Sequence, residues 1–187
     1  MNKKALIVYG TRYGAAASTS EEIAKVLRQE GLEVRVVNAK EEKVKDIADY
    51  DLVVVGSGIQ INKWTGEPED FLKKFQKELA RKKVALFVCC GSASQPTTEP
   101  PEVIAKAKTK YLDEKAAQYH LQPVALGFFG GVYNYNKVPW WSKKAMETGR
   151  PKIEATYKQT ELGIYDTRDW NAIRSWAKEL AKKVQSL

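Results

Sequence analysis

Five apolar runs rich in β-branched residues recur along the chain and predict five strands. They span residues 5–10, 34–38, 51–58, 84–91 and 124–131. Most of these runs are apolar throughout, where a strand with one solvated face would alternate apolar and polar residues. Continuous apolar strands are typical of a parallel sheet whose two faces are both covered by helices.

Helical patterns fill most of the intervals between these runs. Residues 18–30 (STSEEIAKVLRQE) begin with hydroxyl side chains suited to an N-cap, repeat apolar residues at helical spacing and stop at Gly31. Similar signals predict helices at 67–81, 101–118 and 168–184, while the connection 39–50 has room for only a few helical turns. The alternation predicts an α/β fold, a doubly wound five-stranded parallel sheet in a three-layer α/β/α sandwich.

A long segment, residues 131–167, separates the fifth predicted strand from the last helix, and we call it the insert. Loops of this size usually carry function or an interface. Its aromatic residues distinguish it from a disordered linker: Tyr133, Tyr135, Trp140, Trp141, Tyr157 and Tyr165. We expect these aromatics to take part in a homodimer, the alternative being that they fold back onto the sheet edge. No repeat or linker marks a second domain, so residues 1–187 are predicted to form one domain.

Charge and hydropathy narrow the class of protein. No run approaches the length of a membrane helix, and the six apolar residues near the start are too few for a signal peptide, so we expect a cytoplasmic location. The net charge is +8, and residues 137–158 hold six Lys/Arg against two Glu, a net of +4. Such a surface suits an acidic protein partner, an anionic membrane surface or nucleic acid. The tryptophans do not interleave with the lysines, which disfavours nucleic acid.

The side chains alone offer little chemistry. Cys89 and Cys90 are adjacent in the apolar run VALFVCC, so they supply neither a disulfide framework nor a metal site, and we expect both to be buried. His120 is the only histidine, and no serine lies in a G-x-S-x-G setting, so the usual hydrolytic arrangements are missing. A bound cofactor would supply the missing chemistry.

Ligands of open α/β sheets bind beyond the carboxyl ends of the strands, so the loops after the strands predict the ligand. The loop 10–22 (GTRYGAAASTSEE) leads into a helix N-terminus and offers hydroxyl and backbone N–H groups to an anion. It lacks the G-x-G-x-x-G pattern, and the chain lacks a P-loop, which disfavours dinucleotides and ATP. The loops 57–66 (SGIQINKWTG) and 91–98 (GSASQPTT) suit a planar heterocycle, which Trp64 would stack on. Alternatively, Trp64 packs onto the following helix.

Four segments resemble the flavodoxin superfamily, and the resemblance covers nearly the whole chain. They are KKALIVYGTRYGAAASTSEEIAKVL, DLVVVGSGIQINKWTGEPEDFLKKF, CCGSASQ and TRDWNAIRSWAKEL. A branch similar in its first loop, its insert and its Asp-Trp helix start includes menaquinone-dependent protoporphyrinogen dehydrogenase. The resemblance implies that the cofactor is FMN.

The resemblance also implies which residues bind the cofactor. The FMN phosphate would lie against Thr11, Arg12, Tyr13, Gly14, Ala15 and Ala16. The isoalloxazine ring would lie against Ser57, Gly58, Ile59, Gln60, Asn62, Lys63, Trp64, Gly91, Ser92 and Ala93. The family presents a threonine where this chain has Ala16, so that hydroxyl contact is lost or is taken over by Ser18 or Thr19.

Three redox functions are compatible with this resemblance. An electron carrier would pass electrons between redox proteins, which could be acidic, whereas a dehydrogenase would oxidise protoporphyrinogen and a third class would reduce soluble quinones. No loop residue stands out as a general base, which favours the carrier. The basic insert suits either a partner protein or peripheral contact with a membrane. No metal site is expected.

Overall fold

The computed structural model describes residues 2–138, 140 and 143–186. Five parallel strands form the central sheet, as predicted, and their order is β2-β1-β3-β5-β6. The strands are β1 (Lys4–Gly10), β2 (Glu33–Asn38), β3 (Leu52–Gln60), β5 (Lys83–Cys89) and β6 (Ala125–Phe129). A short strand β4 (Lys63–Trp64) pairs antiparallel with the end of β3. The chain order reverses between β1 and β3, which is where such sheets bind ligands.

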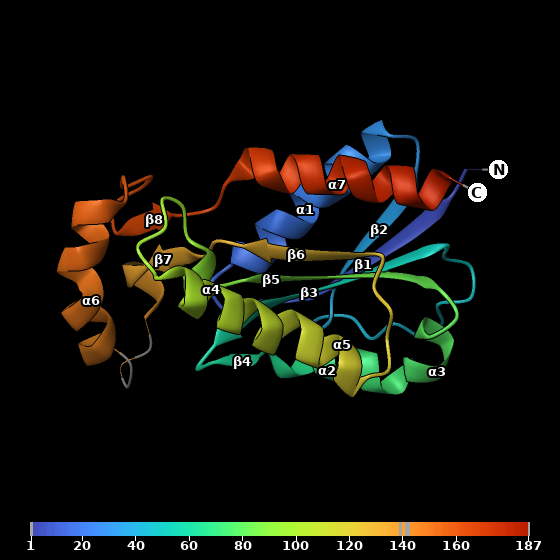
Figure 1. Cartoon of the computed structure of the whole chain (residues 1–187), viewed down its shortest axis with the longest axis horizontal. Helices are drawn as coiled ribbons and strands as arrows, with labels where there is room; N and C mark the ends of the chain where they lie inside the picture. Colours follow the sequence, from blue (N-terminus) through green and yellow to red (C-terminus); the bar gives the residue numbers. More distant parts are fainter. Residues whose placement is uncertain (1, 139, 141–142, 187) are drawn as a thin grey trace.

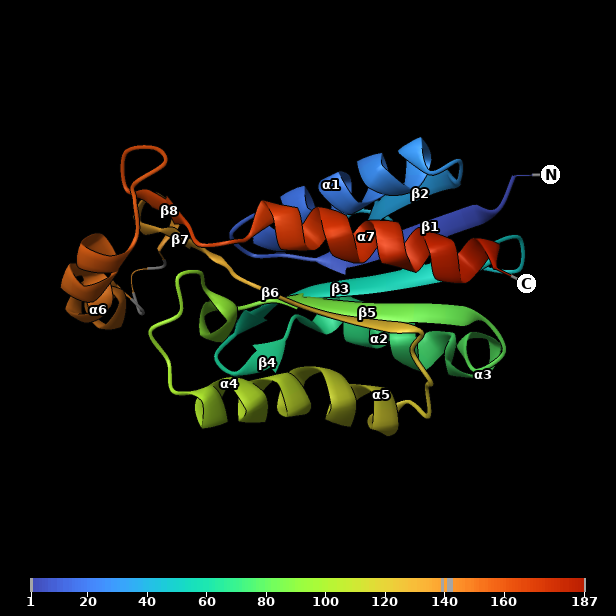
Figure 2. The same ribbon diagram turned by 45° about the horizontal axis from the view of Figure 1, so that its top comes forward.

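Helices cover both faces of the sheet and explain why the strands are apolar throughout. Helices α1 (Ala15–Gln29) and α7 (Trp170–Gln185) lie on one face, and α2 (Gly66–Lys74), α3 (Gln76–Leu79), α4 (Pro101–Lys108) and α5 (Glu114–Gln118) lie on the other (Figures 1 and 2). Neighbouring strand residues point to opposite faces, so Leu6 packs in the core beneath α2–α5 while Ile7 packs in the core beneath α1 and α7.

Several boundaries differ from the predictions. Helix α1 begins at Ala15, three residues earlier than predicted, because Gly14 adopts a left-handed conformation (φ 93°) and serves as the N-cap. The predicted helix 101–118 contains a wide π-turn, η2 (Thr109–Asp113), between α4 and α5. The connection 39–50 forms turns where we expected a few helical turns, and its Val44 and Ile47 are buried against the core.

The insert folds as a small unit at the carboxyl end of the sheet (Figure 1, left). Strands β7 (Val132–Asn134) and β8 (Ile164–Asp166) pair antiparallel, and a 3-10 turn η3 (Tyr135–Lys137) and helix α6 (Lys143–Thr156) connect them. Tyr157 stacks on Tyr133 and Tyr165 packs edge-on against Tyr135, and both are buried, so these two aromatics are not free for an interface. Trp140 is 88% exposed, and Trp141 lies outside the described residues. In the described part of the chain, no helix is both long and apolar enough to cross a membrane.

Candidate functional site

A cavity of about 740 Å³, including its open mouth, lies at the carboxyl ends of β1, β3 and β5. The insert and three loops that follow strands enclose it, and we call residues 10–22 the first loop, residues 57–66 the second loop and residues 91–98 the third loop. The lining residues are Thr11, Arg12, Tyr13, Ala15, Gly58, Ile59, Gln60, Thr65, Cys89, Cys90, Gly91, Gly131, Val132, Tyr133, Asn134 and Met146. The structure therefore brings eight of the sixteen predicted cofactor residues together at one cavity, and the other eight are Gly14, Ala16, Ser57, Asn62, Lys63, Trp64, Ser92 and Ala93.

The first loop forms a compact turn into α1. The Thr11 hydroxyl accepts a hydrogen bond from the Gly14 N–H at 3.0 Å, and the left-handed Gly14 directs the chain into the helix. The first N–H groups of a helix have no acceptor within it, so this turn offers them to an anion at the edge of the cavity.

The two hydroxyls expected to compensate for Ala16 are used within the protein. The Ser18 hydroxyl donates to the Gly14 carbonyl oxygen at 3.1 Å and accepts from Arg168 at 2.6 Å. Thr19 is buried, and its hydroxyl accepts from the same arginine at 3.2 Å. Neither hydroxyl is presented to the cavity, so the proposed substitution for the missing threonine is not seen.

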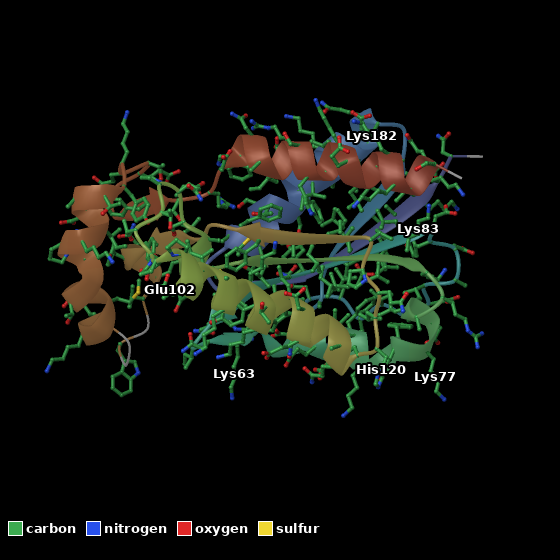
Figure 3. All side chains as sticks on the ribbon, in the orientation of Figure 1. Lys63, Lys77, Lys83, Glu102, His120 and Lys182 are labelled. Atoms are coloured by element: carbon green, nitrogen blue, oxygen red, sulfur yellow. The ribbon has the colours of Figure 1, made fainter. Side chains whose placement is uncertain are left out.

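Arg12 is the one charged side chain among the described residues that line the cavity. Its guanidinium group forms two hydrogen bonds to the Glu67 carboxylate, at 3.0 and 3.1 Å. Burial of Glu67 alone would raise the pKa of its carboxyl group, but the hydrogen bonds from Arg12, a backbone hydrogen bond and the positive charges of Arg12 and Lys40 together outweigh burial, so the pKa is lowered. Lys63 is exposed and extends outward from the fold (Figure 3), so its charge is not part of the cavity wall.

The second loop is a β-hairpin made by β3 and β4. Ser57 is buried beneath it, where its hydroxyl accepts from the Thr65 N–H at 2.9 Å. Trp64 is only 6% exposed, and its indole N–H donates to the Tyr111 carbonyl oxygen at 2.8 Å. Trp64 thus packs against the helical segment 101–118, away from the cavity, and does not take the stacking position expected from the sequence.

Gly58 faces the open part of the cavity. An added Cβ there would meet, among the described residues, only the Gly10 carbonyl oxygen, at 4.0 Å. At Gly56, two residues earlier and on the same face of β3, the same atom would lie 2.0 Å from the Phe87 ring. The absence of a side chain at Gly56 is therefore required by packing, whereas at Gly58 it leaves room for a ligand.

The third loop brings both cysteines to the cavity wall. Both thiols are buried, as predicted. Burial raises the pKa of Cys89 to about 11 and that of Cys90 to about 12. The thiols therefore stay protonated at neutral pH and act as small apolar groups. No cluster of three or more metal-ligating side chains occurs among the described residues.

The insert supplies the remaining wall through Gly131, Val132, Tyr133, Asn134 and Met146. None of these residues was identified from the sequence as lining the site, although the length and aromatic content of the insert predicted a functional role for it. Met146 comes from α6, so this helix reaches the cavity although its position in the chain gives no sign of it.

Two contacts hold the insert against the first and third loops. At its end, the Thr167 hydroxyl lies 2.7 Å from the Ser94 hydroxyl of the third loop. The Arg168 guanidinium is 5% exposed, pairs with Asp166 at 2.7 Å and donates to the Ala15 carbonyl oxygen at 2.9 Å. Arg168 thus connects the insert to the first turn of α1, and no local sequence signal marks it.

Comparisons with known proteins agree with this geometry. A family model described as a flavodoxin domain matches residues 6–160. Protoporphyrinogen IX dehydrogenase (quinone) of Escherichia coli K12 is 21% identical over 178 residues, which span 95% of this chain and 94% of that protein. A flavodoxin from the domain Archaea has a TM-score of 0.56 at 18% identity, covering 98% of this chain and 99% of its own. Oxidised flavodoxin 2 from Bacillus cereus has a TM-score of 0.55 at 19% identity, covering 96% and 99%.

Proposed function

This chain belongs to the flavodoxin domain family, and from that premise we propose that it is an electron-transfer protein that carries electrons on FMN between redox partners. Proteins of this family bind FMN. When bound, FMN can accept and release one or two electrons, which is chemistry that no side chain supplies.

The residues present fit this cofactor. The turn from Thr11 to Ala15 would hold the phosphate through backbone N–H groups at the N-terminus of α1, with no charged side chain required. The space left by Gly58 would admit the flat ring system, with Ile59 and Gly91 beside it. Gly58 is the strongest sign of a bound ligand, because no packing in the described protein requires a glycine there.

The carrier proposal is supported by the chemistry of the side chains that line the cavity. A proton-transferring enzyme needs a group whose pKa lies near neutral pH. Burial instead raises the pKa of both cavity thiols and of the Tyr133 hydroxyl, and Arg12 is paired with Glu67. Electron transfer needs no such group, so these side chains suit a carrier.

A dehydrogenase is the second candidate, and a specific observation favours it. The insert closes one side of the cavity with Val132, Tyr133 and Met146, which would give an apolar substrate a surface to lie on. The Escherichia coli relative named as a quinone-linked protoporphyrinogen IX dehydrogenase aligns over nearly the whole of both chains. In this role the substrate would lose electrons and protons, and a quinone would take up both.

An anaerobic titration separates the two candidates. Purified protein loaded with FMN would be mixed with protoporphyrinogen IX, then with menaquinone, and in parallel with a reduced redox protein. The carrier proposal expects fast electron exchange with the protein and no bleaching of the flavin by the porphyrinogen. Bleaching by the porphyrinogen followed by reoxidation by the quinone would establish the dehydrogenase instead. A protein that takes up no FMN would refute both.

A further inference from the structure

The hairpin β3–β4 that borders the cavity closes in a strained turn. Ile61 and Asn62 both have positive φ angles, 48° and 58°. Asparagine tolerates this conformation, but a β-branched residue such as isoleucine rarely adopts it. The Ile61 side chain is 72% exposed, so packing of that side chain does not compensate for the strain. Something else must hold the turn in place.

Tyr111 holds the hairpin at two points. Its hydroxyl donates to the Asn62 side-chain oxygen at 3.0 Å, and its backbone carbonyl accepts from the Trp64 indole N–H at 2.8 Å. Tyr111 is 7% exposed and lies 49 and 47 residues away from these partners in the chain. The two contacts fall on the turn and on the strand that follows it.

An irregular turn of helix makes this double contact available. Tyr111 lies inside the π-turn η2, where the wider winding separates α4 from α5 beside β4 (Figures 1 and 2). Such turns are rare and often occur at functional sites. Lys115, one turn later, pairs with Glu69 and lies 5.9 Å from the Trp64 ring, which fixes the same strand further.

The hairpin in turn sets the cavity wall. Ile59 pairs with Trp64 and Gln60 pairs with Lys63, so the two cavity-lining residues are opposite the strand that Tyr111 holds. Gln60 also reaches across to the Tyr13 hydroxyl of the first loop, at 3.4 Å. A shift of β4 would therefore move the residues that face the ligand.

We propose that Tyr111 is a positioning residue that holds the strained Ile61–Asn62 turn and thereby fixes Ile59 and Gln60 against the bound cofactor. The tyrosine itself does not line the cavity. The part of this inference that concerns the cofactor rests on the proposed FMN-binding function, whereas the part that concerns the hairpin does not.

The test compares Tyr111→Phe, which removes only the hydroxyl, with Tyr119→Phe, a matched control at a buried position at the far end of the same helical stretch. Hydrogen exchange of the FMN-free proteins would be followed in peptides covering 58–65. FMN affinity would be measured by fluorescence titration, and the absorption bands and midpoint potential of the bound flavin would be recorded. Asn62→Gly, which tolerates the positive φ but lacks the hydrogen-bond acceptor, completes a double-variant cycle with Tyr111→Phe.

We expect Tyr111→Phe to speed exchange in 58–65 and to weaken FMN binding about fivefold, the effect of one hydrogen bond. The absorption bands and potential should shift too, and the change should add nothing to Asn62→Gly. Unchanged exchange would refute the hairpin contact. Faster exchange with unchanged affinity, spectrum and potential would refute the positioning role. Absence of FMN binding by the unaltered protein would refute the proposed function, while the exchange measurement would still test the hairpin.

Discussion

Substitution of Arg168 by methionine tests whether the insert is an integral part of the fold. Methionine keeps much of the side-chain volume and can still pack on the Trp170 ring, which lies 4.2 Å from the guanidinium carbon. It removes the paired hydrogen bonds to Asp166, at 2.8 and 2.7 Å, and the three bonds to the first turn of α1. The Asp166 carboxylate would then be left without its cation in a mostly buried setting.

The magnitude follows from this burial. Removing one partner of a buried ion pair costs about 3–5 kcal/mol, and the lower end applies because the Asp166 side chain keeps 18% exposure. For a chain of this length, a loss of about 3 kcal/mol corresponds to a decrease in melting temperature of roughly 6–12 °C. Adding Asp166→Asn should recover part of the loss, because the uncompensated charge is then gone.

Arg174→Met provides the matched control. Arg174 also connects α7 to α1, through Glu22, but its side chain is 46% exposed. Such a pair contributes about 0.5 kcal/mol. Urea unfolding followed by circular dichroism would give both values. Equal losses for the two variants would show that Arg168 contributes no more than a surface contact, and the account of the insert as fixed to α1 would be wrong.

Three further predictions address the cavity, its thiols and the insert surface. Gly58→Leu should abolish FMN binding in a fluorescence titration while changing the free energy of unfolding by less than about 1 kcal/mol. The control Gly56→Ala clashes with Phe87 and should destabilise the fold by about 1–3 kcal/mol. Strong FMN binding by the leucine variant would place the cofactor elsewhere. The free energy of unfolding should fall as pH rises from about 9 to about 11, because the unfolded thiols ionise there while the raised pKa of Cys89 and Cys90 keeps the folded thiols protonated. Urea titrations at stepped pH would measure this fall, and it should be smaller in the Cys89→Ala, Cys90→Ala double variant. If the exposed Trp140 contributes to a homodimer, sedimentation equilibrium should show a dimer that Trp140→Ser weakens at least tenfold, and a monomer at every concentration would exclude that assembly.

Periodicity in the sequence was enough to predict the sheet, because both faces of each strand are buried and the apolar runs therefore stand out. The same signal could not locate the start of α1. There the left-handed Gly14 ends the loop earlier than the hydroxyl residues suggested, and this depends on a backbone angle. The path of 39–50 also escaped prediction, since Val44 and Ile47 are held by the core and not by local helical hydrogen bonds.

At the site, residues placed by their own loop could be predicted from the sequence, whereas residues placed by contacts with distant segments could not. Residues that line the cavity through their own loop, such as Thr11, Gly58 and Gly91, follow from the rule that ligands bind where parallel strands end. Trp64 does not follow that rule, because its indole N–H donates a hydrogen bond to the Tyr111 carbonyl oxygen in the π-turn, at 2.8 Å. A planar side chain beside a binding loop is thus not evidence of stacking until the hydrogen-bond partner of its polar group is known.

The insert shows why cavity residues can come from a segment that no motif identifies. Met146 reaches the cavity only because the insert returns to the domain body, and that return is fixed by Thr167 against the third loop and by Arg168 against the first. Both contacts use polar groups that are buried and would be costly to leave unpaired. Displacing the insert would therefore expose hydrogen-bonding groups in the first and third loops at once. The cavity and the insert thus depend on each other, so a shortened chain lacking residues 131–167 would lose a wall of the site, the Thr167 contact to the third loop and the Asp166 carboxylate that pairs with Arg168.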